Sequence, residues 1–195
     1  MKISILGAGN VGNALAGGWK KAGHQVLLGA RNPEKNEVSV REAAQSANVL
    51  VLAVPATAVA DAIRAAGDLT GKIILDATNP LLPDLSGLDM PGGISGGERT
   101  AALAKVPVVK IFNNTGYPNM IDADYHGERV TMFYCGDDEN AKKIAAELAK
   151  DLGFDPVDAG PLTQARLLEP LALLWISLAL KQGLGKGIAF KLMRR

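Results

Sequence analysis

The sequence predicts an α/β protein with a doubly wound, mostly parallel β-sheet that is covered by helices on both faces. Short apolar runs alternate with longer amphipathic patterns, the order of strands and helices that such a sheet requires. Residues 49–54 and 106–112 are almost continuously apolar, as parallel strands buried on both faces are. The first apolar run passes directly into a glycine-rich turn that opens a helical pattern. The length suits one hydrophobic core, so we expect a single domain over residues 1–195.

The expected elements follow the apolar pattern along the chain. Strands are expected near residues 2–6, 25–29, 48–54, 72–76, 107–112, 129–135 and 155–158. Helices are expected near residues 10–22, 40–46, 57–66, 97–105, 138–152 and 163–181, the last of them strongly apolar. Gly153 should close the fifth helix, because glycine favours the left-handed conformation after a helix C-terminus. Pro170 should kink the last helix or mark its start.

Two connections are long for a compact domain, Pro80 to Gly96 and Asn113 to Gly127. Both follow expected strands, so both should emerge at the carboxyl edge of the sheet, where open α/β folds bind ligands. Loops of this length often serve as binding loops or lids, although a merely mobile connection would look the same in sequence.

Composition narrows the class of protein. Hydrophobic residues make up 48% of the chain and charged residues 21%, as in ordinary globular domains. The net charge of +1 gives no reason to expect nucleic acid or an acidic membrane as a partner. The longest apolar stretch, 167–180, is shorter than the roughly 20 residues of a membrane helix. Cys135 is the single cysteine, which excludes an internal disulfide and fits a reducing, cytoplasmic location.

The glycine-rich turn after the first expected strand is the strongest functional signal. Gly7 permits the tight turn, Gly9 lets the backbone approach a pyrophosphate, and Gly12 lets the helix pack closely on the strand. The start of the following helix offers unpaired N–H groups and a partial positive charge to an anion. The sequence therefore predicts a Rossmann-type dinucleotide site, and its first segment consists of Gly7, Ala8, Gly9, Asn10, Val11 and Gly12.

The end of the second expected strand indicates which dinucleotide is bound. NAD-specific domains usually carry a carboxylate there, which would repel a 2′-phosphate, and Ala30 removes it. Arg31 supplies a guanidinium that suits a phosphate, Asn32 follows it, and Lys35 either adds a point charge or remains solvated. NADP is therefore favoured over NAD.

The ends of the next three expected strands should converge beside the bound dinucleotide. Val54 and Pro55 are expected to form an apolar wall against the nicotinamide ribose or ring. The amide and hydroxyl groups that follow could serve the carboxamide or a second substrate, or could instead cap turns. The candidate residues of this region are Ala53, Val54, Pro55, Asn79, Asn113 and Thr115.

The sequence shows no catalytic triad, no metal-ligand cluster and no pair of histidine and carboxylate. Asp76 and Lys110, which lie within or at the ends of buried strands, could form a structural ion pair or act in catalysis. A carbonyl dehydrogenase needs a proton donor near the reacting oxygen, whereas hydride transfer between stacked rings needs mainly alignment. The missing acid–base cluster thus favours a planar redox partner.

Several motifs in order resemble one known family, and they span nearly the whole chain. The segments are 7–12, 30–33, 53–55, 76–81, 112–115 and 165–172. They resemble the deazaflavin (coenzyme F420)-dependent NADP oxidoreductases, and the cytosolic domain of the STEAP ferric reductases is similar. The resemblance implies a compact, often dimeric, NADP-binding domain whose partner is a deazaflavin or flavin lying against the nicotinamide.

The resemblance also implies roles for particular residues. The segment Gly9–Gly12 would hold the pyrophosphate and Arg31 the 2′-phosphate, with Val54, Pro55 and the Asn79 segment near the nicotinamide. Relatives often have a hydroxyl residue before the arginine, where this chain has Ala30. One contact to the phosphate is thereby lost.

We therefore expect an NADP(H)-dependent oxidoreductase that uses a deazaflavin or flavin as its small-molecule hydride partner. Reduction of a small carbonyl or imine is an alternative, although such enzymes normally add a helical domain that carries a catalytic lysine. A non-catalytic NADP-sensing module is a third reading. The apolar helix 163–181 is expected to contribute to a homodimer interface.

Overall fold

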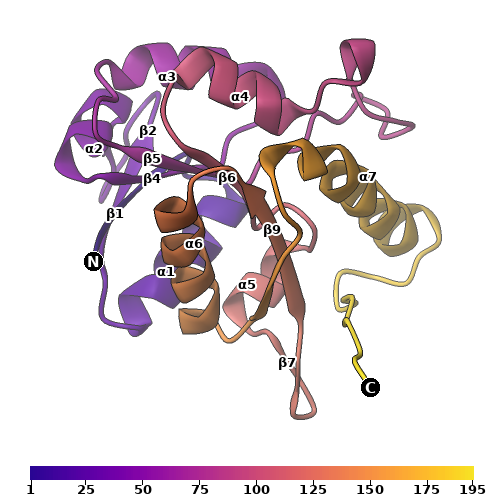
Figure 1. Ribbon diagram of the computed structural model, residues 1–195. Helices are drawn as coiled ribbons and strands as arrows, with labels where there is room; N and C mark the ends of the chain where they lie inside the picture. The colour runs from indigo at the N-terminus through magenta and orange to yellow at the C-terminus, as the bar shows by residue number, and fades with distance from the viewer.

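The computed structural model describes residues 1–195 and contains an eight-stranded sheet between two layers of helices (Figure 1). The strand order is β10-β9-β6-β5-β4-β1-β2-β3, and every neighbouring pair is parallel except β6 and β9. The strands are β1 (Lys2–Leu6), β2 (Gln25–Ala30), β3 (Val38–Ser39), β4 (Val49–Leu52), β5 (Ile73–Asp76), β6 (Val108–Lys110), β9 (Thr131–Gly136) and β10 (Asp155–Asp158).

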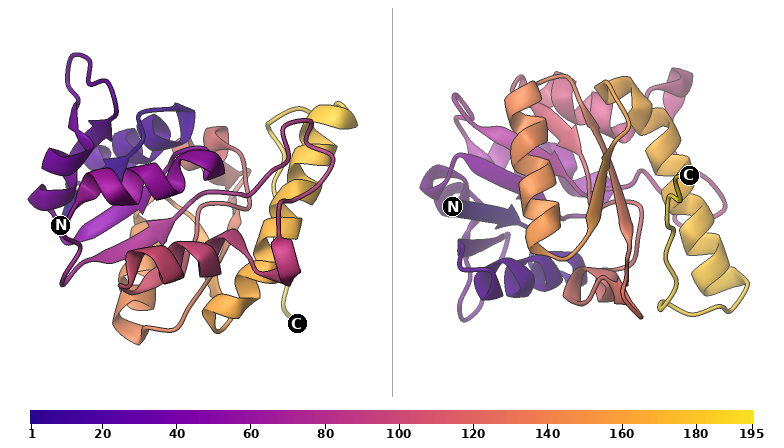
Figure 2. Two further views of the ribbon diagram at one scale, coloured as in Figure 1. Left: turned by 90° about the horizontal axis from the view of Figure 1, so that it is seen from above. Right: turned by 60° about the horizontal axis from the view of Figure 1, so that its bottom comes forward.

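The helices divide between the two faces of the sheet (Figure 2). One layer contains α2 (Val40–Ser46), α3 (Val59–Ala66) and α4 (Gly96–Ala104), and the other contains α1 (Asn10–Lys21), α5 (Tyr117–Ile121) and α6 (Glu139–Asp151). The last helix, α7 (Ala165–Ile176), packs against α4 and β9 and continues into a π turn, Ser177–Lys181. None of the helices combines the length and the hydropathy that crossing a bilayer requires.

The connectivity confirms the predicted fold class. The strands from β3 to β6 have the order β3-β2-β1-β4-β5-β6, which is that of the doubly wound dinucleotide-binding sheet. The chain leaves β1 toward one side and β4 toward the other, so a crevice opens between them at the carboxyl edge. Ligands of such sheets bind at this switch point.

Side chains of the central strands point alternately to the two faces, which explains the near-continuous apolar runs. Val49 and Val51 belong to the core under α1 and α6, while Leu50 and Leu52 belong to the core under α2, α3 and α4. Trp19 is fully buried in the first of these cores. Both cores together fix the sheet between its helices, so the carboxyl edge is a rigid platform.

Short elements were missing from the sequence prediction, because two-residue strands and a five-residue helix show no periodicity. They are β3, α5, the hairpin of β7 (Asp124–Tyr125) and β8 (Glu128–Arg129), and a 3-10 turn, η2 (Pro91–Gly93). The two long connections therefore contain structure. Two helices were also predicted to begin too early. The 3-10 turn η1 (Ala56–Ala58) precedes α3, and the 3-10 turn η3 (Leu162–Gln164) precedes α7.

Local predictions at the helix ends can also be compared with the structure. Gly153 follows α6 with a φ of 86°, as predicted for a glycine after a helix C-terminus. Pro170 lies inside α7 rather than at its start. Beyond α7 the chain folds back, and the carbonyl of Ile188 accepts hydrogen bonds from Trp175 Nε1 and Asn119 Nδ2, both at 2.8 Å. The C-terminal segment is thus fixed beside α5.

Candidate functional site

The glycines of the β1–α1 turn differ in what surrounds them. Gly7 has a φ of 123° and a side chain there would collide with the carbonyl of Ala53. A Cβ on Gly12 would collide with the carbonyl of Gly7, so α1 packs against the turn only because Gly12 lacks a side chain. A Cβ on Gly9 would meet nothing within 4 Å. The backbone at Gly9 is therefore open, as the close approach of a pyrophosphate would require.

The start of α1 is arranged to receive an anion. Its N-cap residue, Gly9, has no side chain that could cap the first N–H groups, and the first turn holds no acidic residue. The Asn13 amide donates to the carbonyls of Ala8, at 2.6 Å, and Gly9, at 3.2 Å, which holds the turn in shape. Free main-chain donors and the helix dipole thus fit a pyrophosphate.

A pocket of about 490 Å³ lies beside this turn, between the end of β2 and α3. It brings together six of the predicted residues: Gly7, Ala8, Ala30, Arg31, Val54 and Pro55. Val54 and Pro55 were expected beside the nicotinamide, but they line the pocket of Arg31, the residue that was expected to bind the 2′-phosphate. α3 and the turn before it also line the pocket, through Ala58, Asp61, Ala62 and Ala65.

The pocket is cationic. Arg31 and Arg41 both line it, and neither takes part in an ion pair. The one carboxylate on its wall, Asp61, is engaged by Arg64 at 2.7 Å. A phosphate that enters this pocket meets unpaired guanidinium groups, which suit its geometry.

Two of the pocket residues that were not predicted, Ser39 and Arg41, carry groups that could donate a hydrogen bond to a phosphate. Ser39 pairs with Ala30 in the register of β2 and β3, and its hydroxyl caps α2 by accepting a hydrogen bond from the N–H of Glu42 at 3.2 Å. Nothing in the local sequence marks β3, which has two residues. The pairing with β2 places Ser39 at the pocket, and the packing of α2 places Arg41 there.

The remaining predicted residues of this region lie around the pocket. Asn32 and Lys35 are exposed in the turn that follows β2 and do not line it. Asn10 lines a neighbouring groove between α1 and α5, together with Tyr117. Val11 packs against the core and Ala53 donates its N–H to Leu6 at 2.9 Å, so both act mainly through the backbone.

The polar residues after β5 and β6 bond chiefly to one another. Asn79 Nδ2 donates to the Asn113 carbonyl at 2.8 Å, and Asn113 Nδ2 donates to Asn79 Oδ1 at 3.0 Å and to the Leu168 carbonyl at 3.2 Å. Both N–H groups of Asn113 are thus used within the protein. Thr115 Oγ1 accepts from Asn119 Nδ2 at 2.7 Å. One N–H of Asn79 and the hydroxyl proton of Thr115 have no partner within the protein, and neither residue lines the Arg31 pocket.

Asp76 and Lys110 form the predicted ion pair, at 3.2 Å, and both side chains are fully buried. A third group was not predicted: Glu169 of α7, also fully buried, contacts Lys110 at 2.9 Å. The Lys110 ammonium additionally donates to the carbonyl of Thr78, so its three N–H groups are all engaged. These charged groups stabilise one another and are closed to a substrate.

The segments that directly follow β4, β5 and β6 contain no titratable side chain. They are residues 53–58, 77–83 and 111–116, with the sequences AVPATA, ATNPLLP and IFNNTG. No group of three or more histidines, cysteines, aspartates and glutamates is arranged to hold a metal ion. Burial raises the pKa of the Cys135 thiol to about 12, which leaves it unreactive near neutral pH.

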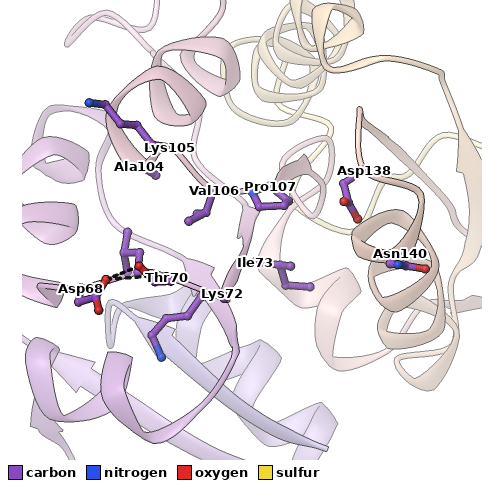
Figure 3. A pocket seen from close by; sticks show the side chains of 12 residues that line it. Asp68, Thr70, Lys72, Ile73, Ala104, Lys105, Val106, Pro107, Asp138 and Asn140 are labelled. Atoms are coloured by element: carbon purple, nitrogen blue, oxygen red, sulfur yellow. Dashed lines mark hydrogen bonds between the residues drawn. The ribbon is translucent and has the colours of Figure 1, made fainter.

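A larger hollow, of about 580 Å³, lies at the other edge of the sheet (Figure 3). Its lining comes from the segments that precede β5 and β6 and from the start of α6, including Lys72, Pro107 and Asp138. This is the amino edge of the parallel strands, opposite the glycine turn. Since doubly wound sheets bind dinucleotides at the carboxyl edge, we place the candidate site at the Arg31 pocket.

Main-chain donors at the β1–α1 junction, next to a guanidinium-lined pocket at the switch point, place the chain in the class of dinucleotide-binding α/β proteins. Residues 2–80 match the family model described as NADP oxidoreductase, coenzyme F420-dependent. A proposed F420-dependent NADP reductase from Arthrobacter sp. FB24 has a crystal structure that superposes with a TM-score of 0.89, at 31% identity and with both chains fully covered. The chain belongs to this family and is an NADP-dependent oxidoreductase.

Two further relatives and one structural neighbour differ in how much of their length the similarity covers. The F420-dependent NADP reductase of Methanothermobacter marburgensis is 29% identical over 93% of this chain and 93% of its own length. The metalloreductase STEAP3 of Rattus norvegicus is 32% identical over 88% of this chain, but the match covers only 36% of STEAP3. A reductive aminase from Aspergillus terreus shares the fold, with a TM-score of 0.69 and 22% identity.

Proposed function

We propose that this protein transfers a hydride between NADP(H) and a deazaflavin or flavin. The observation that carries the proposal is that residues 53–58, 77–83 and 111–116, which follow β4, β5 and β6, contain no titratable side chain. The two charged groups in the hollow beside the first two segments, Asp89 and Arg99, are bonded to each other at 3.1 Å. Hydride transfer between two stacked rings requires alignment and no proton donor. The two F420-dependent relatives support the same partner.

NADP(H) fits the residues at the carboxyl edge. The N–H groups at the start of α1 would hold the pyrophosphate over Gly9, where space is open. Arg31 would bind the 2′-phosphate, with Arg41 and the Ser39 hydroxyl close by in the same pocket. When bound, the nicotinamide supplies or accepts the hydride. The protein's own contribution is to orient the cofactor and to exclude water.

Reduction of a carbonyl or imine fits this site less well. Such a reaction needs an acid close to the reacting atom. The lysine at the carboxyl edge, Lys110, is buried and holds Asp76 and Glu169, so it cannot reach a substrate. This chain is similar to the reductive aminase in fold alone.

The experiment is an acceptor screen with purified protein, in which NADPH absorbance is followed with coenzyme F420, FMN, FAD, small ketones and cyclic imines. We expect turnover with the deazaflavin or a flavin and none with the ketones and imines. The reverse reaction, NADP reduction by the reduced deazaflavin, serves as the check on direction. Turnover confined to ketones or imines contradicts the proposal, and tight NADPH binding without any turnover indicates a sensing module.

We also propose that the outer face of α7 is covered by a second copy of the chain. Leu167 is 66% exposed and Leu174, two turns further on, is 50% exposed on the same side of the helix. Leu180 in the following π turn is 50% exposed as well. Large apolar side chains grouped in this way favour an interface.

A further inference from the structure

Glu169 connects α7 to three parts of the molecule at once. Its carboxylate accepts hydrogen bonds from the backbone N–H groups of Gly96 and Gly97, both at 2.9 Å, and from the Lys110 ammonium at 2.9 Å. Gly96 and Gly97 form the first turn of α4, and Lys110 is the last residue of β6. Through Lys110 the contact extends to Asp76, the last residue of β5.

The two glycines allow this carboxylate to approach the helix. A Cβ on Gly96 would lie 3.1 Å from Glu169 Oε1 and 3.3 Å from the Pro80 ring. A Cβ on Gly97 would lie 3.2 Å from the Cβ of Ala165 in α7 and 3.5 Å from the Lys110 side chain. All three charged side chains are fully buried. Because these groups are closely packed and fully hydrogen-bonded, we expect the three charged side chains to be held in a single arrangement.

The residue next to Glu169 controls the turn after β6. The carbonyl of Leu168 accepts a hydrogen bond from Asn113 Nδ2, and Asn113 in turn exchanges hydrogen bonds with Asn79. Asn79 and Asn113 follow β5 and β6, which are the same two strands that Glu169 holds through Asp76 and Lys110. The position of α7 therefore affects both turns at the carboxyl edge. Glu169 acts through its contact with Lys110, and Leu168 acts through the hydrogen bond that its carbonyl accepts from Asn113.

We propose that Glu169 is a positioning residue for hydride transfer, which acts through Lys110 and the Asn79–Asn113 pair to fix the floor beneath the nicotinamide. This inference rests on the proposed function. Hydride transfer is sensitive to the distance between the reacting carbons, and a misplacement of about 1 Å can cost roughly 100-fold in rate. The adenosine end of the cofactor would lie at the Arg31 pocket, which other elements form. Glu169 therefore governs the placement of the nicotinamide and the rate of hydride transfer, and not the anchoring of the adenosine end.

The chain offers a matched control for this role. Arg166, one turn before Glu169 on α7, also joins α7 to α4, because its guanidinium donates to both oxygens of Glu98 at 2.9 and 2.7 Å. Its side chain is 49% exposed and touches neither β5 nor β6. Arg166→Ala therefore weakens the same helix pair without a direct effect on the turns.

The test compares Glu169→Gln with Arg166→Ala and the wild type. We expect Glu169→Gln to lower kcat for NADPH oxidation by about 10- to 100-fold and to raise the deuterium isotope effect with NADPH labelled at the nicotinamide C4. The affinity for 2′,5′-ADP, which has no nicotinamide, should stay within about 2-fold of the wild type, as the Arg31 pocket is unchanged. Arg166→Ala should alter the unfolding temperature but neither kcat nor the isotope effect.

Gly96→Ala provides a second, milder variant in case Glu169→Gln folds poorly, since its methyl group would press on the carboxylate without removing it. It should lower kcat in the same direction and leave 2′,5′-ADP binding intact. An unchanged kcat and isotope effect in either folded variant overturns the proposal, as does an equal loss of kcat in Arg166→Ala. If the wild type proves inactive with every acceptor, the proposed function has failed. The positioning role is then tested by NADPH affinity relative to 2′,5′-ADP, and an equal ratio in wild type and Glu169→Gln overturns it.

Discussion

At the scale of single residues, we attribute the use of NADP to Arg31 and to the absence of a carboxylate at Ala30. Arg31 is exposed at the pocket and unpaired, so its guanidinium is free to meet a phosphate. We predict that Arg31→Ala weakens NADPH binding by about 1–3 kcal/mol and changes NADH binding little. Fluorescence titration with both cofactors measures this difference. An equal loss for both cofactors would remove Arg31 from the 2′-phosphate site.

The glycines of the turn give a prediction that separates binding from folding. Gly9→Val places a side chain in open space, so the protein should fold normally yet lose dinucleotide binding. Gly12→Ala places a methyl group against the Gly7 carbonyl, so it should lower the free energy of unfolding by about 1–3 kcal/mol. Urea denaturation and NADPH titration of both variants check this contrast. Retained NADPH affinity in a folded Gly9→Val variant would contradict the proposed cofactor position.

At the scale of elements, the contact between α4 and α7 shows how two helices are joined by charge. Ser95 and Glu98 form a capping box at the start of α4, and Arg166 binds the same Glu98 from α7. Arg166 chiefly, with Ser95, lowers the pKa of Glu98 from 4.5 to about 2. The carboxylate of Glu98 is therefore stabilised in the folded state.

This pKa shift predicts how stability depends on pH. The folded-state pKa of Glu98 lies below its unfolded value, so its contribution is complete above about pH 4.5 and is lost as the pH falls toward 2. Glu98→Gln should therefore be less stable than the wild type near neutral pH, and this difference should shrink below about pH 4.5. Urea denaturation of both proteins across the range measures it. A difference that is constant with pH would show that the ion pair adds no stability.

At the scale of the whole molecule, the prediction concerns assembly. If a second copy covers the outer face of α7, replacing Leu167 and Leu174 by glutamate should give monomers, because a buried interface cannot hold unpaired carboxylates. Analytical ultracentrifugation distinguishes the two states. Leu103→Glu on α4 is the matched control, since Leu103 is 53% exposed but lies outside α7, and it should stay dimeric. A wild type that sediments as a monomer at micromolar concentration would exclude this interface.

The features that depend on local sequence patterns could be predicted from the sequence. The apolar runs marked the seven longer strands, since a parallel strand is buried on both faces. The turn from Gly7 to Gly12 marked the β1–α1 junction, because main-chain geometry there requires glycine at fixed spacing. The ion pair of Asp76 and Lys110 also followed from charges within apolar strands, which need a buried partner.

Other features arise only when distant segments meet. Glu169 lies 59 residues after Lys110 in a helix of apolar character, and no local pattern assigns its partner. Ser39 reaches the Arg31 pocket from a two-residue strand that has no periodicity of its own, and Arg41 reaches it from the first turn of α2. The amides of Asn79 and Asn113 looked available for a ligand, whereas the fold turns most of their donors toward each other. The sequence alone thus determined the sheet, the glycine turn and the cofactor class, because these depend on near neighbours along the chain. The tertiary structure alone decided which polar groups remain free, because hydrogen bonds and burial depend on neighbours in space.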